Sequence, residues 1–148
     1  SVPAATIPMV RKDFPTIRQM EFSPSGDFLL GSLSNDHIYL YNVTNPASPK
    51  QKVISRKYGV GIVKFARYNG SNTHSVIHTS TKRNDDIRLL CMDRNNYEMY
   101  YTGHTDKVHS LSVSPKEDVF FSTSMDKTAR FWSCRNPRPL STLFLSSS

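Results

Sequence analysis

Short runs of β-branched and aromatic residues, separated by turn residues about every 8–12 positions, fill this chain of 148 residues and leave almost no helical periodicity. The arrangement of runs and turns recurs three times. Aligning the three segments on their third run gives two columns, six residues apart: Asn35, Asn84 and Asp126, then Tyr41, Leu90 and Trp132. Successive segments are 49 and 42 residues apart in this alignment. The repetition predicts an all-β fold made of similar small sheets.

The third segment carries the most specific combination of residues. Gly103-His104 opens it, Ser114-Pro115 follows its first run, Asp126 stands in a tight turn and Trp132 closes its third run. A four-strand unit that repeats at about 40–45 residues and carries these residues resembles the blade of a WD-repeat β-propeller. The resemblance predicts three four-stranded blades over residues 16–56, 61–102 and 103–145, with an N-terminal extension (1–15) and a short tail (146–148).

Four residues of the third segment, His104, Ser122, Asp126 and Trp132, form the candidate site. In a WD-repeat blade they make a structural relay, in which His104 bonds Asp126 and the Ser122 hydroxyl, and that hydroxyl reaches the Trp132 indole. The same residue types occur in hydrolase triads, which need an exposed serine on a sharp turn and an oxyanion hole. Ser122 lies within the apolar run VFFSTS and no GxSxG motif is present. We therefore interpret the set as structural and expect no enzyme activity.

Cysteine and histidine usage gives no indication of a metal or cofactor site. Cys91 and Cys134 each lie in an apolar stretch without CxxC spacing, which favours buried thiols in a reducing compartment. His74 and His78 face one side of a strand, but two ligands without a third are a weak metal site. No apolar run reaches the ~18 residues of a membrane span, and the opening SVPAATIPMV does not fit a signal peptide. We expect an intracellular, soluble protein without metal or cofactor.

Basic residues dominate the middle of the chain. Lys and Arg number 19 against 12 Asp and Glu, which gives a net charge of +7, and no acidic residue lies between Asp36 and Asp85. This charge favours an acidic or phosphorylated protein segment as partner, with direct nucleic-acid binding as the alternative and a merely solubilising role as a third reading. The candidate partner-binding surface is formed by Lys50, Lys52, Arg56, Lys57, Tyr58, Lys64, Arg67, Lys82 and Arg83.

Three stretches resemble one WD-repeat family in particular. They are SRKYGV from Ser55, TSTKRNDDIRLLCMDRNNYEMYYTGH from Thr79, and VSPKEDVFFSTSMDKTARFW from Val113. Together they are similar to the WD-repeat subunit of the COMPASS histone methyltransferase complex, which also serves in the cleavage-and-polyadenylation and phosphatase machinery of RNA polymerase II termination. The resemblance implies a nuclear, non-catalytic scaffold. Its partners would be subunits of a complex that methylates histone-three at its fourth-position lysine.

Three blades fall short of the 4–8 that close a propeller, so the resemblance covers only the first part of that family's ring. Two sheet faces would remain bare, which favours association with a partner or with other chains. Two hypotheses follow from the blade count. Either a pair of chains completes a six-bladed ring, or the chain is a truncated propeller fragment without function.

Overall fold

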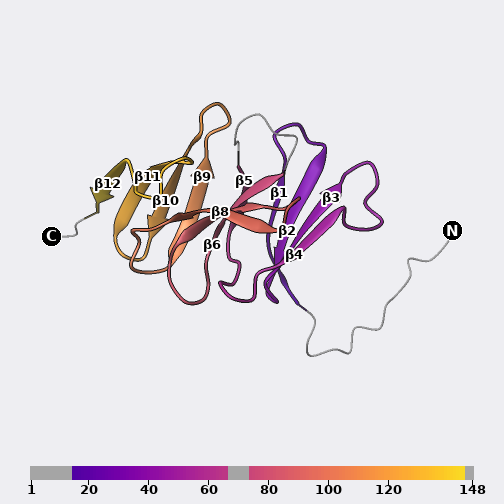
Figure 1. The fold of residues 1–148 in the computed structure, drawn as a ribbon, viewed down its shortest axis with the longest axis horizontal. Helices are drawn as coiled ribbons and strands as arrows, with labels where there is room; N and C mark the ends of the chain where they lie inside the picture. Colours follow the sequence, from indigo (N-terminus) through magenta and orange to yellow (C-terminus); the bar gives the residue numbers. More distant parts are fainter. Residues whose placement is uncertain (1–14, 67–73, 146–148) are drawn as a thin grey trace.

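The computed structural model describes residues 15–66 and 74–145, and in these ranges twelve strands form three four-stranded antiparallel sheets (Figure 1). Blade 1 contains β1 (Ile17–Phe22), β2 (Phe28–Leu33), β3 (His37–Asn42) and β4 (Gln51–Ile54). Blade 2 contains β5 (Val63–Phe65), β6 (Ser75–Thr79), β7 (Ile87–Cys91) and β8 (Asn96–Tyr101). Blade 3 contains β9 (Val108–Val113), β10 (Val119–Ser124), β11 (Thr128–Ser133) and β12 (Ser141–Phe144). The prediction of an all-β fold with three four-stranded blades is confirmed, and the three sheets do not close into a ring.

Equivalent turns of the three blades use the same backbone conformation. The turn between the second and third strand contains a non-glycine residue with positive φ in each blade: Asp36 at 66°, Arg83 at 70° and Lys127 at 67°. The left-handed conformation costs a side-chain-bearing residue about 1–2 kcal/mol, so each turn requires compensation from its surroundings. Hydrogen bonds around Asp36 and Asp126, described below, hold two of these turns in place.

Strand pairing follows the alignment seen in the sequence. Tyr41, Leu90 and Trp132 occupy the same place on the third strand, opposite Leu29, Val76 and Phe120 respectively. Because side chains alternate between the faces of a sheet, residues in one column of the alignment share one face of their blades. Blades 2 and 3 each pack this face against the opposite face of the blade before them.

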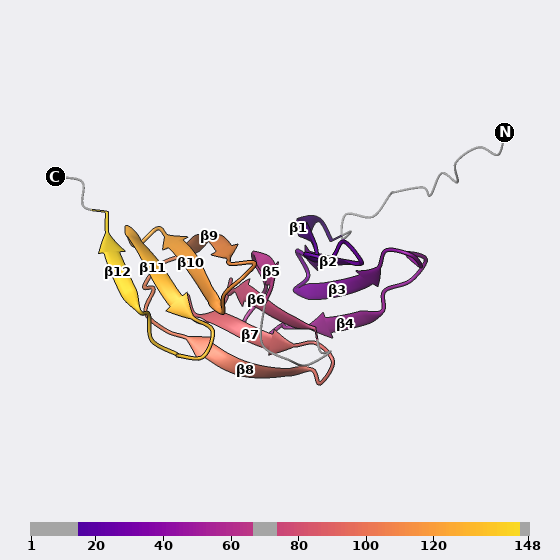
Figure 2. The same cartoon turned by 90° about the horizontal axis from the view of Figure 1, so that it is seen from above.

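The hydrophobic core lies between the sheets, in two layers. One layer joins blades 1 and 2 and contains Leu30, Leu40, Val76 and Leu90; the other joins blades 2 and 3 around Trp132. The Trp132 ring stacks on Phe120 with centroids 5.9 Å apart and meets Tyr101 edge-on at 5.8 Å. Full burial of each large side chain contributes about 1.5–3 kcal/mol, so these layers hold the blades together. Figure 2 shows the three sheets side by side, with blades 1 and 3 at the two ends.

The cysteine thiols match the expectation of reduced, buried side chains. Cys91 and Cys134 are both free and buried. Burial raises the pKa of the Cys134 thiol to about 11, and Asp118 acts in the same direction. Within residues 15–66 and 74–145, the structure contains no helix with the length and hydrophobicity of a membrane span.

Candidate functional site

The four residues of the candidate site come from three places in blade 3. His104 lies in the link before β9, Asp126 lies in the turn between β10 and β11, and Ser122 and Trp132 face each other from those two strands. His104 Nδ1 lies 2.8 Å from Asp126 Oδ2, and His104 Nε2 lies 2.7 Å from Ser122 Oγ. The Trp132 indole N–H donates to Ser122 Oγ at 2.8 Å. The four side chains thus form one continuous chain of hydrogen bonds.

The direction of each hydrogen bond in this relay follows from its two ends. Trp132 can only donate, so Ser122 accepts from it and donates its own proton to His104 Nε2. His104 Nδ1 then carries the proton that Asp126 accepts. Burial lowers the pKa of His104 more than the hydrogen bond and charge of Asp126 raise it. The imidazole is therefore neutral, and its contact with Asp126 is a hydrogen bond rather than an ion pair.

Asp126 is the acceptor at the end of the relay. Its carboxylate also accepts from the Thr105 N–H at 3.1 Å, the Thr128 N–H at 2.9 Å and the Thr128 hydroxyl at 2.6 Å. Burial alone would raise the pKa of Asp126, but the hydrogen bonds from Thr128, His104 and Thr105 outweigh it and hold the pKa well below its ordinary value. The charged carboxylate thus fastens the β10–β11 turn to the link before β9.

The Ser122, His104 and Asp126 contacts have the spacing of a catalytic triad, but the serine is enclosed. Ser122 is 1% exposed, and its hydroxyl already accepts from Trp132 and donates to His104. A nucleophilic serine must reach a substrate carbonyl and be activated for attack. The position of Ser122, on a strand between two packed sheets, leaves the hydroxyl no such access.

Blade 1 contacts the link to blade 2 through Asp36, a residue that sequence reasoning did not select. Its carboxylate accepts from the Val60 N–H at 3.2 Å and from Lys82 Nζ at 2.6 Å. Arg18 Nη1 donates to the Val60 carbonyl at 2.7 Å and lies 3.9 Å from Asp36 Oδ1. The column alignment placed Asn35 in the position of Asp126, but the acidic residue that bonds this link is its neighbour.

A second polar network, which was also not predicted from the sequence, lies between blades 1 and 2. His78 Nδ1–H donates to the Thr79 carbonyl at 2.9 Å, so His78 Nε2 accepts from the Tyr97 hydroxyl, also at 2.9 Å. The Tyr97 hydroxyl in turn accepts from Ser55 of blade 1. Burial lowers the pKa of His78 to about 4, so the ring is neutral and structural. Within the described ranges, no cluster of three potential metal ligands forms around His74 or His78.

The candidate basic surface divides into separate regions. Arg56, Lys57 and Tyr58 lie in the link between β4 and β5, beside Lys82 and Arg83 of the β6–β7 turn. Lys82 joins the two segments, since its backbone N–H donates to the Tyr58 carbonyl at 2.9 Å and its Nζ to the Arg56 carbonyl at 3.3 Å. We call Arg56, Lys57, Lys82 and Arg83, whose side chains are all exposed, the basic rim.

The other basic candidates have different surroundings. Lys52 lies on β4 opposite Tyr39 and, with Arg56, helps to lower the pKa of His37, after the larger effect of burial. Lys50 lies over the Phe28 ring at 4.9 Å, in the hairpin before β4, and Lys64 on β5 lies 3.9 Å from Glu21 Oε2. Arg67 lies outside the described residues. The structure therefore gathers only part of the predicted surface at one edge.

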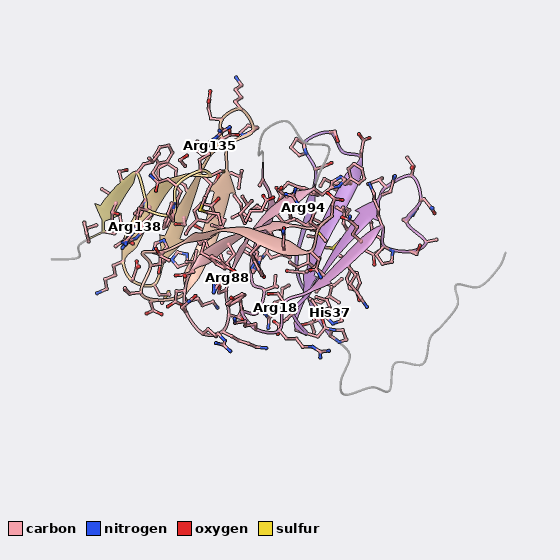
Figure 3. All side chains as sticks on the ribbon, in the orientation of Figure 1. Arg18, His37, Arg88, Arg94, Arg135 and Arg138 are labelled. Atoms are coloured by element: carbon pink, nitrogen blue, oxygen red, sulfur yellow. The ribbon has the colours of Figure 1, made fainter. Side chains whose placement is uncertain are left out.

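Tyr58 has its ring engaged by cations. The Arg88 guanidinium lies 3.6 Å from its ring centroid and Lys57 Nζ lies 5.2 Å away, while Tyr100 meets it at 6.0 Å. Figure 3 shows Arg18 and His37 at the lower edge of the molecule, with Arg135 at the upper edge. The ring of Tyr58 is thus part of a packed cation–π stack rather than a free platform for a nucleic-acid base.

Comparison with known proteins agrees with the fold. The family model described as WD domain, G-beta repeat, matches residues 96–133, which include His104, Ser122, Asp126 and Trp132. Together with the three four-stranded sheets, this match defines the class: the chain is a WD40-repeat protein.

Among such proteins the chain is similar to a particular group. It is 38% identical over 92% of its length to WD repeat-containing protein 82 of Drosophila melanogaster, covering 41% of that protein. It is 35% identical over 88% of its length to Set1 complex component swd2 of Schizosaccharomyces pombe, covering 35% of it. It is 34% identical over 86% of its length to COMPASS component SWD2 of Saccharomyces cerevisiae, covering 37% of it. The chain thus spans well under half the length of these relatives.

Proposed function

We propose that this chain is a non-catalytic scaffold subunit of a nuclear histone methyltransferase complex of COMPASS type. In this role it helps to bring methylation of the fourth-position lysine of histone-three to transcribing RNA polymerase II and links the complex to termination. The observation that carries the proposal is the similarity, over about nine-tenths of the chain, to proteins named as Set1 complex and COMPASS components. The enclosed position of Ser122 supports a binding role over a hydrolytic one.

We propose further that the basic rim is the part of this chain that receives a partner. Arg56, Lys57 and Arg83 are exposed, and within residues 15–66 and 74–145 none of them is paired with a carboxylate. Lys82 contributes less net charge, because Asp36 lies 2.6 Å from its Nζ. Three uncompensated cations on one edge favour an acidic or phosphorylated segment of a complex subunit. The partners would be methyltransferase subunits and, in termination, polyadenylation or phosphatase subunits.

Purification of the tagged chain from nuclear extract tests the proposal. We expect methyltransferase-complex subunits, with or without polyadenylation and phosphatase subunits, to be identified by mass spectrometry. A triple charge reversal, Arg56→Glu with Lys57→Glu and Arg83→Glu, should reduce their recovery. A control reversal of Arg94→Glu with Arg135→Glu adds negative charge elsewhere and should leave recovery unchanged. Recovery of chaperones alone, from a chain that melts cooperatively, would contradict the scaffold role and favour a non-functional fragment.

The nucleic-acid alternative is separated by a second measurement. Binding of bare RNA or DNA through the rim predicts an affinity that falls steeply with salt and is lost in the triple charge reversal. We expect only weak binding without sequence preference, because the ring of Tyr58 is covered by Arg88. Tight binding of single-stranded RNA by the wild-type chain at physiological salt would instead favour the alternative.

A further inference from the structure

Serine is followed directly by proline at three places in the chain: Ser23-Pro24, Ser48-Pro49 and Ser114-Pro115. Such a pair is the acceptor sequence of proline-directed protein kinases, whose substrate groove favours a residue without a backbone N–H after the serine. A kinase of this class modifies a serine whose hydroxyl is free and whose flanking backbone can enter the groove as an extended segment. The structure separates the three serines by these two requirements.

Ser23 and Ser114 hold equivalent turns after the first strands of blades 1 and 3. Ser23 Oγ accepts from the Phe28 N–H at 3.1 Å, and Ser114 Oγ accepts from the Glu117 N–H at 3.0 Å. Their backbone is fixed as well, since the Ser23 N–H donates to the Phe28 carbonyl at 2.8 Å and the Ser114 N–H to the Val119 carbonyl at 3.0 Å. Both serines are half-buried. Their hydroxyls therefore serve the fold.

Ser48 lies in the connection between β3 and β4, residues 43–50, all of which are exposed. This connection is longer than those between the third and fourth strands of the other blades, residues 92–95 and 134–140. Figures 1 and 2 show it projecting at the right-hand side of blade 1. The Ser48 side chain makes no hydrogen bond to any residue in the described ranges. Its hydroxyl is therefore free to react.

Two prolines shape the backbone around Ser48. Pro49 follows it directly, and Pro46 lies two residues before it. Each proline disfavours the helical conformation in the residue that precedes it, so Asn45 and Ser48 are biased toward extended backbone. From Pro46 to Pro49, no backbone N–H or carbonyl is bonded to another residue that the structure describes. This segment can therefore enter a kinase groove without breaking hydrogen bonds of the sheet.

We propose that Ser48 is a phosphorylation site for a proline-directed protein kinase. The kinase transfers the γ-phosphoryl group of ATP: a bond forms between Ser48 Oγ and the γ-phosphorus, the bond from that phosphorus to the β–γ bridging oxygen breaks, ADP leaves and the hydroxyl proton is released. The phosphate adds a charge of about −1.5 to −2 at pH 7. Because Lys50 and Lys52 follow closely in the sequence, the modification cancels positive charge at this edge of blade 1.

Treatment of the folded chain with a purified mitogen-activated protein kinase and Mg-ATP tests the proposal. Mass spectrometry of the intact chain and of its peptides gives the number and position of the phosphates. We expect one phosphate per chain, at Ser48, and its loss in Ser48→Ala and in Pro49→Ala. The matched control is the double variant Ala47→Ser with Ser48→Ala, which moves the hydroxyl one residue away from Pro49 and should also take no phosphate. All these side chains are exposed, so the variants should fold.

The same chemistry is checked in cells. In the tagged chain isolated under phosphatase inhibition, we expect phosphate on Ser48 and its loss when proline-directed kinases are inhibited. A folded chain that accepts no phosphate from the purified kinase, or accepts it mainly at Ser23 or Ser114, would overturn the proposal. An unmodified Ser48 in the chain isolated from cells would also overturn it. None of these readouts depends on recovery of complex subunits, so they stand apart from the test of the scaffold role.

Discussion

Asp126 is the residue whose removal most directly tests the relay in blade 3. Asp126→Ala deletes the acceptor of four hydrogen bonds, from His104, from the Thr105 N–H and from the N–H and hydroxyl of Thr128. Thr105 is exposed, so its N–H can bond water instead. His104 and Thr128 are buried, and their donors lose their partner inside the protein. Buried unpaired donors determine the size of the effect.

The expected loss of stability is about 1–3 kcal/mol. An unsatisfied buried donor costs about 1–3 kcal/mol, and Asp126→Ala removes the acceptor of buried donors on two residues, His104 and Thr128. The cost is partly offset because Thr128 Oγ1, 3.2 Å from His104 Nδ1, can accept the histidine proton instead. For a chain of about 150 residues such a loss lowers the melting temperature by roughly 2–12 °C.

Fluorescence of Trp132 is a direct assay, since it is the single tryptophan of the chain and its indole belongs to the relay. Chemical unfolding of wild type and Asp126→Ala is followed through this signal. Asp118→Ala, which removes a surface ion pair to Arg135, is the control and should change stability by less than about 1 kcal/mol. An Asp126→Ala protein as stable as the wild type would refute the reasoning that the relay holds blade 3 together.

Three further predictions concern the polar networks and turns. Burial lowers the pKa of His78 from 6.5 to about 4 in the folded chain, so below pH 6.5 the unfolded chain binds more protons than the folded one. The free energy of unfolding should therefore fall by about 3 kcal/mol as the pH drops from 6.5 to 4. His78→Gln should reduce this pH dependence when unfolding is measured at a series of pH values. Gly59 has φ +68°, and a Cβ there would lie 1.8 Å from Thr81 Oγ1; in thermal melts Gly59→Ala should destabilise more than Gly26→Ala, whose Cβ meets no atom within 4 Å. Ser122→Ala should lower the unfolding midpoint measured by Trp132 fluorescence, whereas an unchanged midpoint with loss of a hydrolytic turnover would favour a catalytic triad.

Repetition explains how much of the fold could be predicted from the sequence. Columns such as Tyr41, Leu90 and Trp132 recur 49 and 42 residues apart, and each residue has the equivalent place in the strand register of its blade. The relay residues could be named because Gly103-His104, Asp126 and Trp132 all fall within one repeat. A pattern confined to a single repeating unit is visible without knowledge of how the units pack.

Contacts between repeats could not be predicted in this way. The Ser55 hydroxyl bonds the Tyr97 hydroxyl of the next blade, and the Asp36 carboxylate accepts from the Val60 N–H in the link to that blade. Each of these pairs joins two different repeats, so neither appears as a column when the repeats are aligned. The basic stretch was treated as one surface because its residues lie close in sequence. Lys50 lies over Phe28 in the hairpin before β4, and Lys64 on β5 lies beside Glu21, so neither belongs to the basic rim. Charge counted along a chain does not reveal the edge on which each loop lies.

Depletion of the chain from cells, followed by measurement of histone-three methylation at the fourth-position lysine, tests the proposed scaffold role most directly. Global level and distribution over transcribed genes are compared with those of an unrelated histone modification. The scaffold role predicts a selective fall in fourth-position methylation, restored by the wild-type chain but not by the triple charge reversal of Arg56, Lys57 and Arg83. Unchanged methylation after complete depletion would contradict membership of a COMPASS-type complex.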